Sequence, residues 1–138
     1  MKISTKGRYA VEIMSDLAIY SAMDRLESLR NVAERRGLSE KYLERIIRAL
    51  KEAGLVISVR GVYGGYCLAK PAEQITIHEI LSAVEGELAP VECLTKQTDC
   101  GMDCDRCVTR GTWYDMWCEI LKVVESVSVA DIVKRAVF

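Results

Sequence analysis

The sequence has no long apolar run, although half of its 138 residues are hydrophobic. A membrane-spanning helix needs about 20 consecutive apolar residues, and no stretch approaches that length. The first apolar stretch is interrupted by Glu12 and Asp16, so it lacks the continuous apolar centre of a secretory signal peptide. Internal repeats and low-complexity tracts are also absent. We therefore expect a cytoplasmic protein that binds no membrane, with one domain or one small domain and an oligomerisation element.

Net charge is also scarce, at −1 for the whole chain, but it is unevenly distributed. Residues 1–70 carry 13 Lys and Arg against 8 Asp and Glu, a net +5, whereas residues 71–138 carry 6 against 12, a net −6. A basic region favours contact with phosphate. The N-terminal half is therefore the half predicted to meet a nucleic acid.

The order of the predicted elements indicates a mainly α protein with a small β-hairpin. Apolar residues recur at helical spacing from Thr5, taken as an N-cap, to near Met23, then over residues 29–36, and again after Ser39. Gly37 ends the second helix and begins a tight turn. Residues 55–59 and 66–69, joined by a glycine-rich tip, predict a hairpin. Three helices followed by a two-stranded wing are the order of a winged helix-turn-helix.

The second half of the chain contains two capping boxes and one long apolar helix. Thr76 and Glu79 have the spacing of a capping box and predict a helix to about residue 84. Residues 90–106 show neither helical nor strand periodicity. A broad apolar face then predicts a long helix from about residue 107, and Ser128 with Asp131 predicts a capping box before a short terminal helix.

The candidate nucleic-acid contacts gather on the third helix and on the wing. A helix-turn-helix places the N-terminal part of its second helix in the major groove. There Glu44 can accept a hydrogen bond from a cytosine amino group, and Arg45 can donate two hydrogen bonds to guanine. Arg48 is predicted to touch phosphate, and Arg60 is placed for the adjacent minor groove. A solvated helix face is the alternative for these charges. The predicted DNA contacts are Lys6, Arg8, Ser39, Glu40, Lys41, Tyr42, Glu44, Arg45, Arg48, Arg60, Gly61, Tyr63, Gly64 and Gly65.

Several separated motifs resemble the Rrf-two family of bacterial transcription regulators, over nearly the whole chain. They are Ser4-Thr5-Lys6-Gly7-Arg8-Tyr9-Ala10, Gly37-Leu38-Ser39-Glu40-Lys41-Tyr42-Leu43-Glu44, Gly54-Leu55-Val56, and Arg60-Gly61 through Gly64-Gly65-Tyr66. The resemblance implies a winged helix-turn-helix plus a long C-terminal dimerisation helix. It divides the chain into a DNA-binding domain (1–84), a cysteine-rich cluster-binding loop (85–106), and the dimerisation and terminal helices (107–138). Double-stranded operator DNA and a second copy of the chain are the implied partners.

Four of the six cysteines lie in the irregular segment: Cys93, Cys100, Cys104 and Cys107. A disulfide framework is not expected in a reducing cytosol. Thiolates at this density bind iron–sulfur clusters, zinc or copper(I). Structural zinc sites often use paired Cys-x-x-Cys motifs, and only Cys104 and Cys107 have that spacing. The chain also contains the Cys-x3-Cys-x2-Cys motif of radical SAM enzymes, but it is too short for their barrel, so we expect no enzyme.

The IscR-like branch of the family implies Cys93, Cys100 and Cys107 as ligands of an iron–sulfur cluster, with [2Fe–2S] favoured over the [4Fe–4S] implied by the NsrR-like and RirA-like branches. Arg110 stands where IscR has a histidine as its fourth ligand, and arginine does not ligate iron. Cys104 is the simplest replacement. The NsrR-like branch implies the alternative, a non-cysteine ligand from the first helix of the second copy, for which Glu12 or Asp16 could serve.

These inferences predict a DNA-binding regulator, expected to be a repressor, that senses cluster status, iron, redox state or nitric oxide. Two alternatives stay open. In the first, a regulator of the same fold uses its cysteines for zinc or for thiol redox sensing. In the second, a CymR-like regulator is controlled by a protein partner from sulfur metabolism. A cluster-assembly protein is the other protein partner that we expect. Cys67 and Cys118 are predicted to pack as small apolar residues, and His78 is predicted to be a surface residue.

Overall fold

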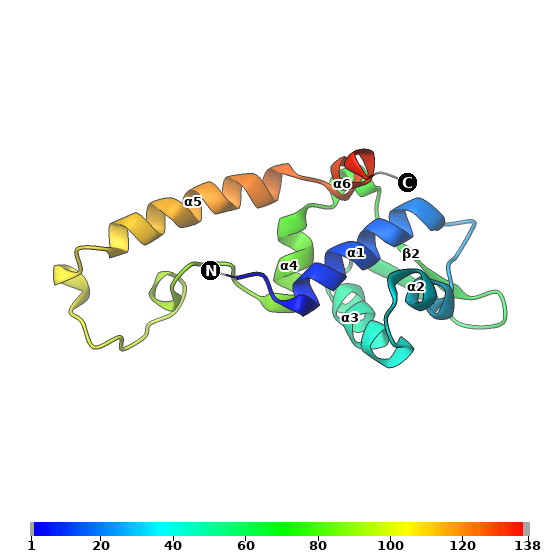
Figure 1. The fold of residues 1–138 in the computed structure, drawn as a ribbon, viewed down its shortest axis with the longest axis horizontal. Helices are drawn as coiled ribbons and strands as arrows, with labels where there is room; N and C mark the ends of the chain where they lie inside the picture. Colours follow the sequence, from blue (N-terminus) through cyan, green and yellow to red (C-terminus); the bar gives the residue numbers. More distant parts are fainter. Residues whose placement is uncertain (1, 137–138) are drawn as a thin grey trace.

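The structure, a computed structural model, describes residues 2–136 (Figure 1). Three helices open the fold: α1 (Thr5–Tyr20), α2 (Leu29–Arg36) and α3 (Glu40–Glu52). The hairpin follows as β1 (Val56–Val59) and β2 (Gly65–Leu68), with a 3-10 turn η1 (Ala72–Gln74) before α4 (Ile77–Glu85). Two more 3-10 turns, η2 (Glu92–Leu94) and η3 (Cys104–Arg106), precede α5 (Arg110–Ser126) and α6 (Val129–Arg135). This order confirms the predicted winged helix-turn-helix followed by a long helix.

Helix boundaries follow their capping residues. Ser39 caps α3 and Thr76 caps α4, the latter in a complete capping box, as predicted. The predicted start of α1 was wrong by one residue, because Ser4, not Thr5, caps it by accepting a hydrogen bond from the Gly7 N–H. The helix also ends at Tyr20 rather than near Met23, since the following serine turns both its N–H and its hydroxyl onto the Leu17 carbonyl.

The core lies between α1, α2, α3, α4 and α6. The inner stripe of α1 is fully buried, as the periodicity predicted, and so is that of α3. Helix α1 packs against α4 on one side and α6 on another, so the C-terminal helix closes the same core that the N-terminal helix opens. The buried apolar side chains of the two stripes are Ala10, Ile13, Met14, Leu17, Leu43, Ile46, Ile47 and Leu50.

The wing is an antiparallel pair in which Val56 faces Leu68 and Val59 faces Gly65. Its tip requires glycine for reasons internal to the fold. A Cβ on Gly64 would lie 2.0 Å from the carbonyl oxygen of Val59, and one on Gly65 would lie 2.6 Å from that of Glu27. The two glycines therefore allow the hairpin to close and to pack against the segment before α2.

Helix α5 differs from the others because it has no buried residue. The segment of residues 86–109 loops out beyond the other helices, and α5 leads from it back to the body, where it joins α6 (Figure 1). Its main contact within the chain is with α4. Three large apolar side chains of α5, Tyr114, Met116 and Val123, are exposed. Among residues 2–136, no helix combines the length and the apolar character needed to cross a membrane.

Candidate nucleic-acid interface and cysteine segment

The outward face of α3 carries the side chains that sequence analysis assigned to DNA. Glu40, Lys41, Glu44, Arg45 and Arg48 are all exposed. The Ser39 hydroxyl accepts a hydrogen bond from the Tyr42 N–H at 3.2 Å, so its side chain holds the start of the helix. The N-terminal turns of α3 therefore present polar groups on a surface backed by a rigid apolar core.

A groove of about 490 Å³ lies between α3 and the wing. Cations from both elements line it: Arg48 and Lys51 from α3, and Arg60 from the turn of the wing directly after β1. One carboxylate, Glu44, lies beside them, and its Oε1 is 4.0 Å from Nη2 of Arg48. Both side chains of that pair are more than half exposed, so the pairing is weak and each remains available to a ligand. The rest of the lining includes three predicted residues, Gly61, Gly64 and Gly65, and two unpredicted ones, Ser28 and Tyr66.

The wing tip projects two large side chains into solvent. Val62 and Tyr63 are each 95% exposed, and the turn beneath them is closed by the Gly64 N–H bonded to the Gly61 carbonyl. Gly61 has a φ of 115°, which favours glycine. An aromatic ring this exposed makes no packing contribution, so it is free for a surface outside the chain.

The remaining predicted DNA contacts lie outside the groove. The ring of Tyr42 packs edge-to-face on Tyr9, with ring centroids 5.9 Å apart, and is half-buried. Arg8 is exposed but lines a different cavity with Arg36 and Ile77. Lys6 is exposed one helical turn before Tyr9. These three residues stay predicted DNA contacts, and their positions support that prediction less than the positions of the groove residues do.

The cysteine segment has no converged site. All six cysteines are free, and within residues 2–136 no three metal-ligating side chains converge. Cys93 and Cys104 line one cavity of about 320 Å³, together with Arg110. The Arg110 guanidinium donates to the Cys93 carbonyl oxygen at 3.5 Å, a long contact. The structure thus brings two of the four predicted thiols to one cavity, but not Cys100 or Cys107.

Cys107 lies just before α5 and has a perturbed thiol. A hydrogen bond with the Thr109 hydroxyl, 3.6 Å away, lowers the pKa of Cys107 below its ordinary value. The backbone N–H groups of Thr109 and Arg110 lower it further. Donors at the start of a helix favour a thiolate, and the thiolate is the form that binds metals.

The four thiols fit an iron–sulfur group by chemistry and by chain flexibility. They are soft donors, all are at least partly exposed, and the segment that bears them contains only two single-turn 3-10 helices. The segment can therefore rearrange around a metal without breaking a long helix or a sheet. Which residues ligate stays a prediction.

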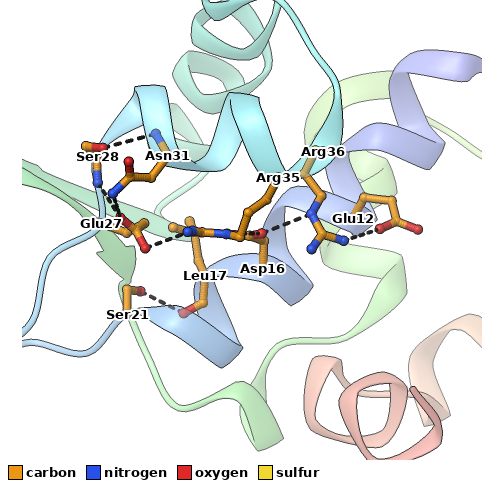
Figure 2. Close-up of polar contacts among 9 residues, drawn as sticks. All are labelled: Glu12, Asp16, Leu17, Ser21, Glu27, Ser28, Asn31, Arg35 and Arg36. Carbon is orange, nitrogen blue, oxygen red and sulfur yellow. Dashed lines mark hydrogen bonds and ion pairs between the residues drawn. The ribbon is translucent and has the colours of Figure 1, made fainter. Parts of the chain in front are cut away.

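One alternative ligand is excluded by the structure. Asp16 is fully buried and paired with Arg35 and Arg36 of α2, as Figure 2 shows, so it cannot reach a metal bound outside the core. The expectation that it could serve was wrong, because this carboxylate of α1 is enclosed by the arginines of α2. Glu12 stays half-exposed, although its Oε2 lies 3.2 Å from Arg36.

The other two cysteines and the histidine are embedded in the fold to different degrees. Cys67 is buried, as predicted, and burial raises the pKa of its thiol. Cys118 is only half-buried on α5. His78 keeps 31% of its side chain exposed, with Nδ1 3.9 Å from a carboxylate oxygen of Glu125 on α5.

Sequence analysis missed the ion pair between Glu27 and Arg35. Its partners are brought together by the packing of the elements, which leaves no periodic signal in the sequence.

Comparisons with known proteins agree with this architecture. Residues 3–135 match the family model Rrf2, described as an iron-dependent transcriptional regulator. The regulator IscR of Xenorhabdus nematophila is 38% identical over 135 residues, which cover 98% of this chain and 80% of that protein. Among solved structures, CymR of B. subtilis, described as the global cysteine regulator, has a TM-score of 0.81 at 35% identity, with 99% of each chain covered. IscR of T. potens has a TM-score of 0.77 at 39% identity, covering 97% of this chain and 87% of that one. The chain therefore belongs to the Rrf2 family of transcriptional regulators.

Proposed function

We propose that the protein is a homodimeric, DNA-binding repressor whose affinity for its operator is controlled by an iron–sulfur cluster held by Cys93, Cys100, Cys104 and Cys107. The observation that carries the DNA assignment is the groove between α3 and the wing, where cations of both elements face the same space. A recognition helix in the major groove and a wing beside it would both touch the backbone from that position.

The dimer assignment rests on the unpartnered face of α5. Helix α5 has 17 residues, none of its side chains is fully buried, and its contact with α4 covers only part of its apolar surface. Met116 and Val123, about two helical turns apart, expose apolar surface on one side of it. A second copy of the same helix would cover these side chains and would set the distance between two recognition helices.

The cluster assignment rests on the cysteine segment and on the IscR relatives. Cys93 and Cys104 already share a cavity, which favours Cys104 as the fourth ligand in place of the histidine that Arg110 replaces. A bound cluster supplies a redox- and iron-responsive centre, for which [2Fe–2S] is favoured. Ordering of residues 93–107 by ligation fixes the entry to α5, and so couples the segment to the dimer helix.

A thiol-based sensor is the second candidate, and one observation favours it. Cys107 has a lowered pKa and a partly exposed thiol, which are the features of a reactive cysteine. CymR of B. subtilis, described as a cysteine regulator, is similar over the whole chain. In this candidate the segment responds to thiol oxidation or to a sulfur-metabolism partner without a cluster.

The DNA assignment is tested with a duplex that the protein itself selects from a random-sequence library. We expect Arg48→Ala to weaken binding and to reduce the slope of log affinity against log salt by about 1, because one phosphate contact is lost. Lys122→Ala on α5 is the control, since it removes an exposed cation far from the groove. Unchanged binding and slope for Arg48→Ala would remove α3 from the interface.

The cluster's role is tested with the same duplex. Affinity is measured for anaerobically reconstituted protein and for protein stripped of iron. A difference between the two that disappears in Cys107→Ala supports control by the cluster. Equal affinities would separate DNA binding from the cysteine segment and would favour the thiol-based candidate only if oxidation then changes affinity.

A further inference from the structure

A buried ion-pair network fastens α2 onto α1. Asp16 of α1 is fully buried, and Arg35 holds it with two hydrogen bonds, from Nε to Oδ2 at 3.0 Å and from Nη2 to Oδ1 at 2.9 Å. Nε of Arg36 lies 2.9 Å from the same Oδ2 (Figure 2). A buried carboxylate is tolerated only where cations and donors surround it. The last turn of α2 is therefore fixed in position against α1.

The same arginine reaches a second carboxylate. Nη2 of Arg35 donates to Oε2 of Glu27 at 2.7 Å, and its guanidinium lies 4.1 Å from the ring centroid of Tyr20. Oε1 of Glu27 accepts from the Ser28 N–H at 3.0 Å and from Asn31 Nδ2 at 2.9 Å. Burial opposes ionisation of Glu27, but the hydrogen bonds from Asn31 and Arg35 hold its pKa below the ordinary value. Glu27 thus stays charged, and its side chain, 12% exposed, has partners for both oxygens.

The backbone of Glu27 belongs to the wing. Its N–H donates to the Tyr66 carbonyl at 2.9 Å, and its carbonyl accepts from the Tyr66 N–H at 2.8 Å. Glu27 therefore forms an antiparallel bridge with β2, beside the hairpin. The close approach of Gly65 to the same carbonyl keeps this contact tight. One residue therefore has its side chain held by α2 and its backbone paired with β2.

We propose that Glu27 and Arg35 are positioning residues for DNA binding, which fix the wing relative to α3 and thereby hold Arg60 beside Arg48 in the groove. Neither side chain needs to touch DNA. The proposal rests on the proposed function, because the placement of the wing affects affinity only if the groove meets DNA. The guanidinium geometry is essential: a lysine at 35 cannot bridge two carboxylates with a planar fork.

A double-mutant cycle tests the proposal against a merely structural role. Affinity for the duplex selected by the wild-type protein is measured for wild type, Glu27→Gln, Arg60→Ala and the double variant. We expect Glu27→Gln to weaken binding about tenfold when Arg60 is present, the size of one lost charge-assisted contact, and less than about twofold when it is absent. Equal losses in both backgrounds would overturn the proposal, because Glu27 would then not act through the wing.

The matched control is Glu34→Gln. Glu34 pairs with Arg30 on the same helix α2, but this pair is exposed, with 67% and 78% of the two side chains accessible. An exposed pair of this kind contributes little. We expect duplex affinity within about twofold of wild type. A loss as large as that of Glu27→Gln would show that any charge change on α2 or just before it has this effect and would overturn the assignment to Glu27.

Hydrogen exchange tests the wing attachment without DNA. In Glu27→Gln, the Tyr66 amide should exchange about tenfold faster, while the amides of the α1 and α3 core turns keep their wild-type rates. Unchanged exchange at Tyr66 would overturn the proposal even if DNA binding is weakened. If the wild-type protein selects no duplex, the proposed function fails, whereas faster exchange confined to the wing still supports the attachment.

Discussion

Residues 5–85 and α6 together bury a continuous apolar core, whereas residues 86–109 and α5 bury no side chain completely. The first region carries the predicted DNA contacts, and the second carries four cysteines and an unpartnered apolar helix face. The first holds its groove in place with its own packing and with the ion pairs around Arg35. In the proposed function the second region is completed from outside the chain, by a second copy for α5 and by a metal group for the thiols. A sensor built in this way would keep its DNA-reading surface fixed and leave its responsive segment adaptable.

The largest expected effect is on the core of the first region. Leu17→Ala removes a fully buried side chain that faces the centre of the fold. We expect a loss of about 2–5 kcal/mol in the free energy of unfolding, from lost burial plus the cavity left behind. Urea unfolding of the metal-free protein followed by circular dichroism measures it. A loss below about 1 kcal/mol would show that the core is less tightly packed than its burial indicates.

A charge on the exposed face of α5 should leave the fold intact and weaken the dimer. Val123 is 61% exposed within one chain, and we expect Val123→Lys to raise the dimer dissociation constant at least about thirtyfold, because a buried interface penalises an unpaired ammonium group. Analytical ultracentrifugation measures it, with Asp115→Lys on the polar side of α5 as the control. An unchanged dissociation constant for Val123→Lys would place the dimer interface elsewhere.

Helix capping also differs between the two regions, and its effect on the free energy of unfolding is expected to be smaller. Thr76 completes a capping box at α4, whereas Thr109 at the start of α5 makes no side-chain cap. We expect Thr76→Ala to cost about 1 kcal/mol in the free energy of unfolding and Thr109→Ala to cost about 0.3 kcal/mol or less. Thermal unfolding of the metal-free protein compares the two. Equal losses would contradict the view that the first region alone is held by its local structure.

The smallest effect is a difference in thiol reactivity. Hydrogen bonds with Thr109 lower the pKa of Cys107, whereas burial raises the pKa of Cys67. In the metal-free protein at neutral pH, iodoacetamide should therefore alkylate Cys107 first and Cys67 last, and alkylation of Cys107 should begin at lower pH than that of an unstructured thiol. Mass spectrometry of timed samples gives the order. Early modification of Cys67 would show that the wing opens readily.

What sequence could predict differs between the two regions for a physical reason. The capping boxes at Thr76 and Ser128 and the buried stripes of α1 and α3 are local patterns, so residue spacing alone predicts them. The contact between Asp16 and Arg35 joins residues 19 positions apart and depends on how two helices cross, which no periodicity encodes. This is why the sequence left Asp16 open as a possible metal ligand.

The contacts of the wing glycines and of the cysteines could not be predicted from sequence spacing either. Gly64 and Gly65 were predicted as places where DNA could approach the backbone, and the structure adds contacts with Val59 and Glu27 that require glycine within the fold itself. In the cysteine segment the spacing indicated metal chemistry but not which thiols meet. The shared cavity of Cys93 and Cys104 is a property of the folded loop, which has no repeating pattern from which it could be predicted.

The central claim, that residues 93–107 hold an iron–sulfur cluster, is tested most directly by the iron and sulfide content of protein purified without oxygen. Wild type is compared with Cys104→Ala, Cys107→Ala and, as the control, Cys118→Ala on α5. We predict a coloured protein with matching iron and sulfide, loss of both in Cys107→Ala, depletion in Cys104→Ala, and full retention in Cys118→Ala. A colourless wild-type protein that contains zinc, or no metal at all, would contradict the account.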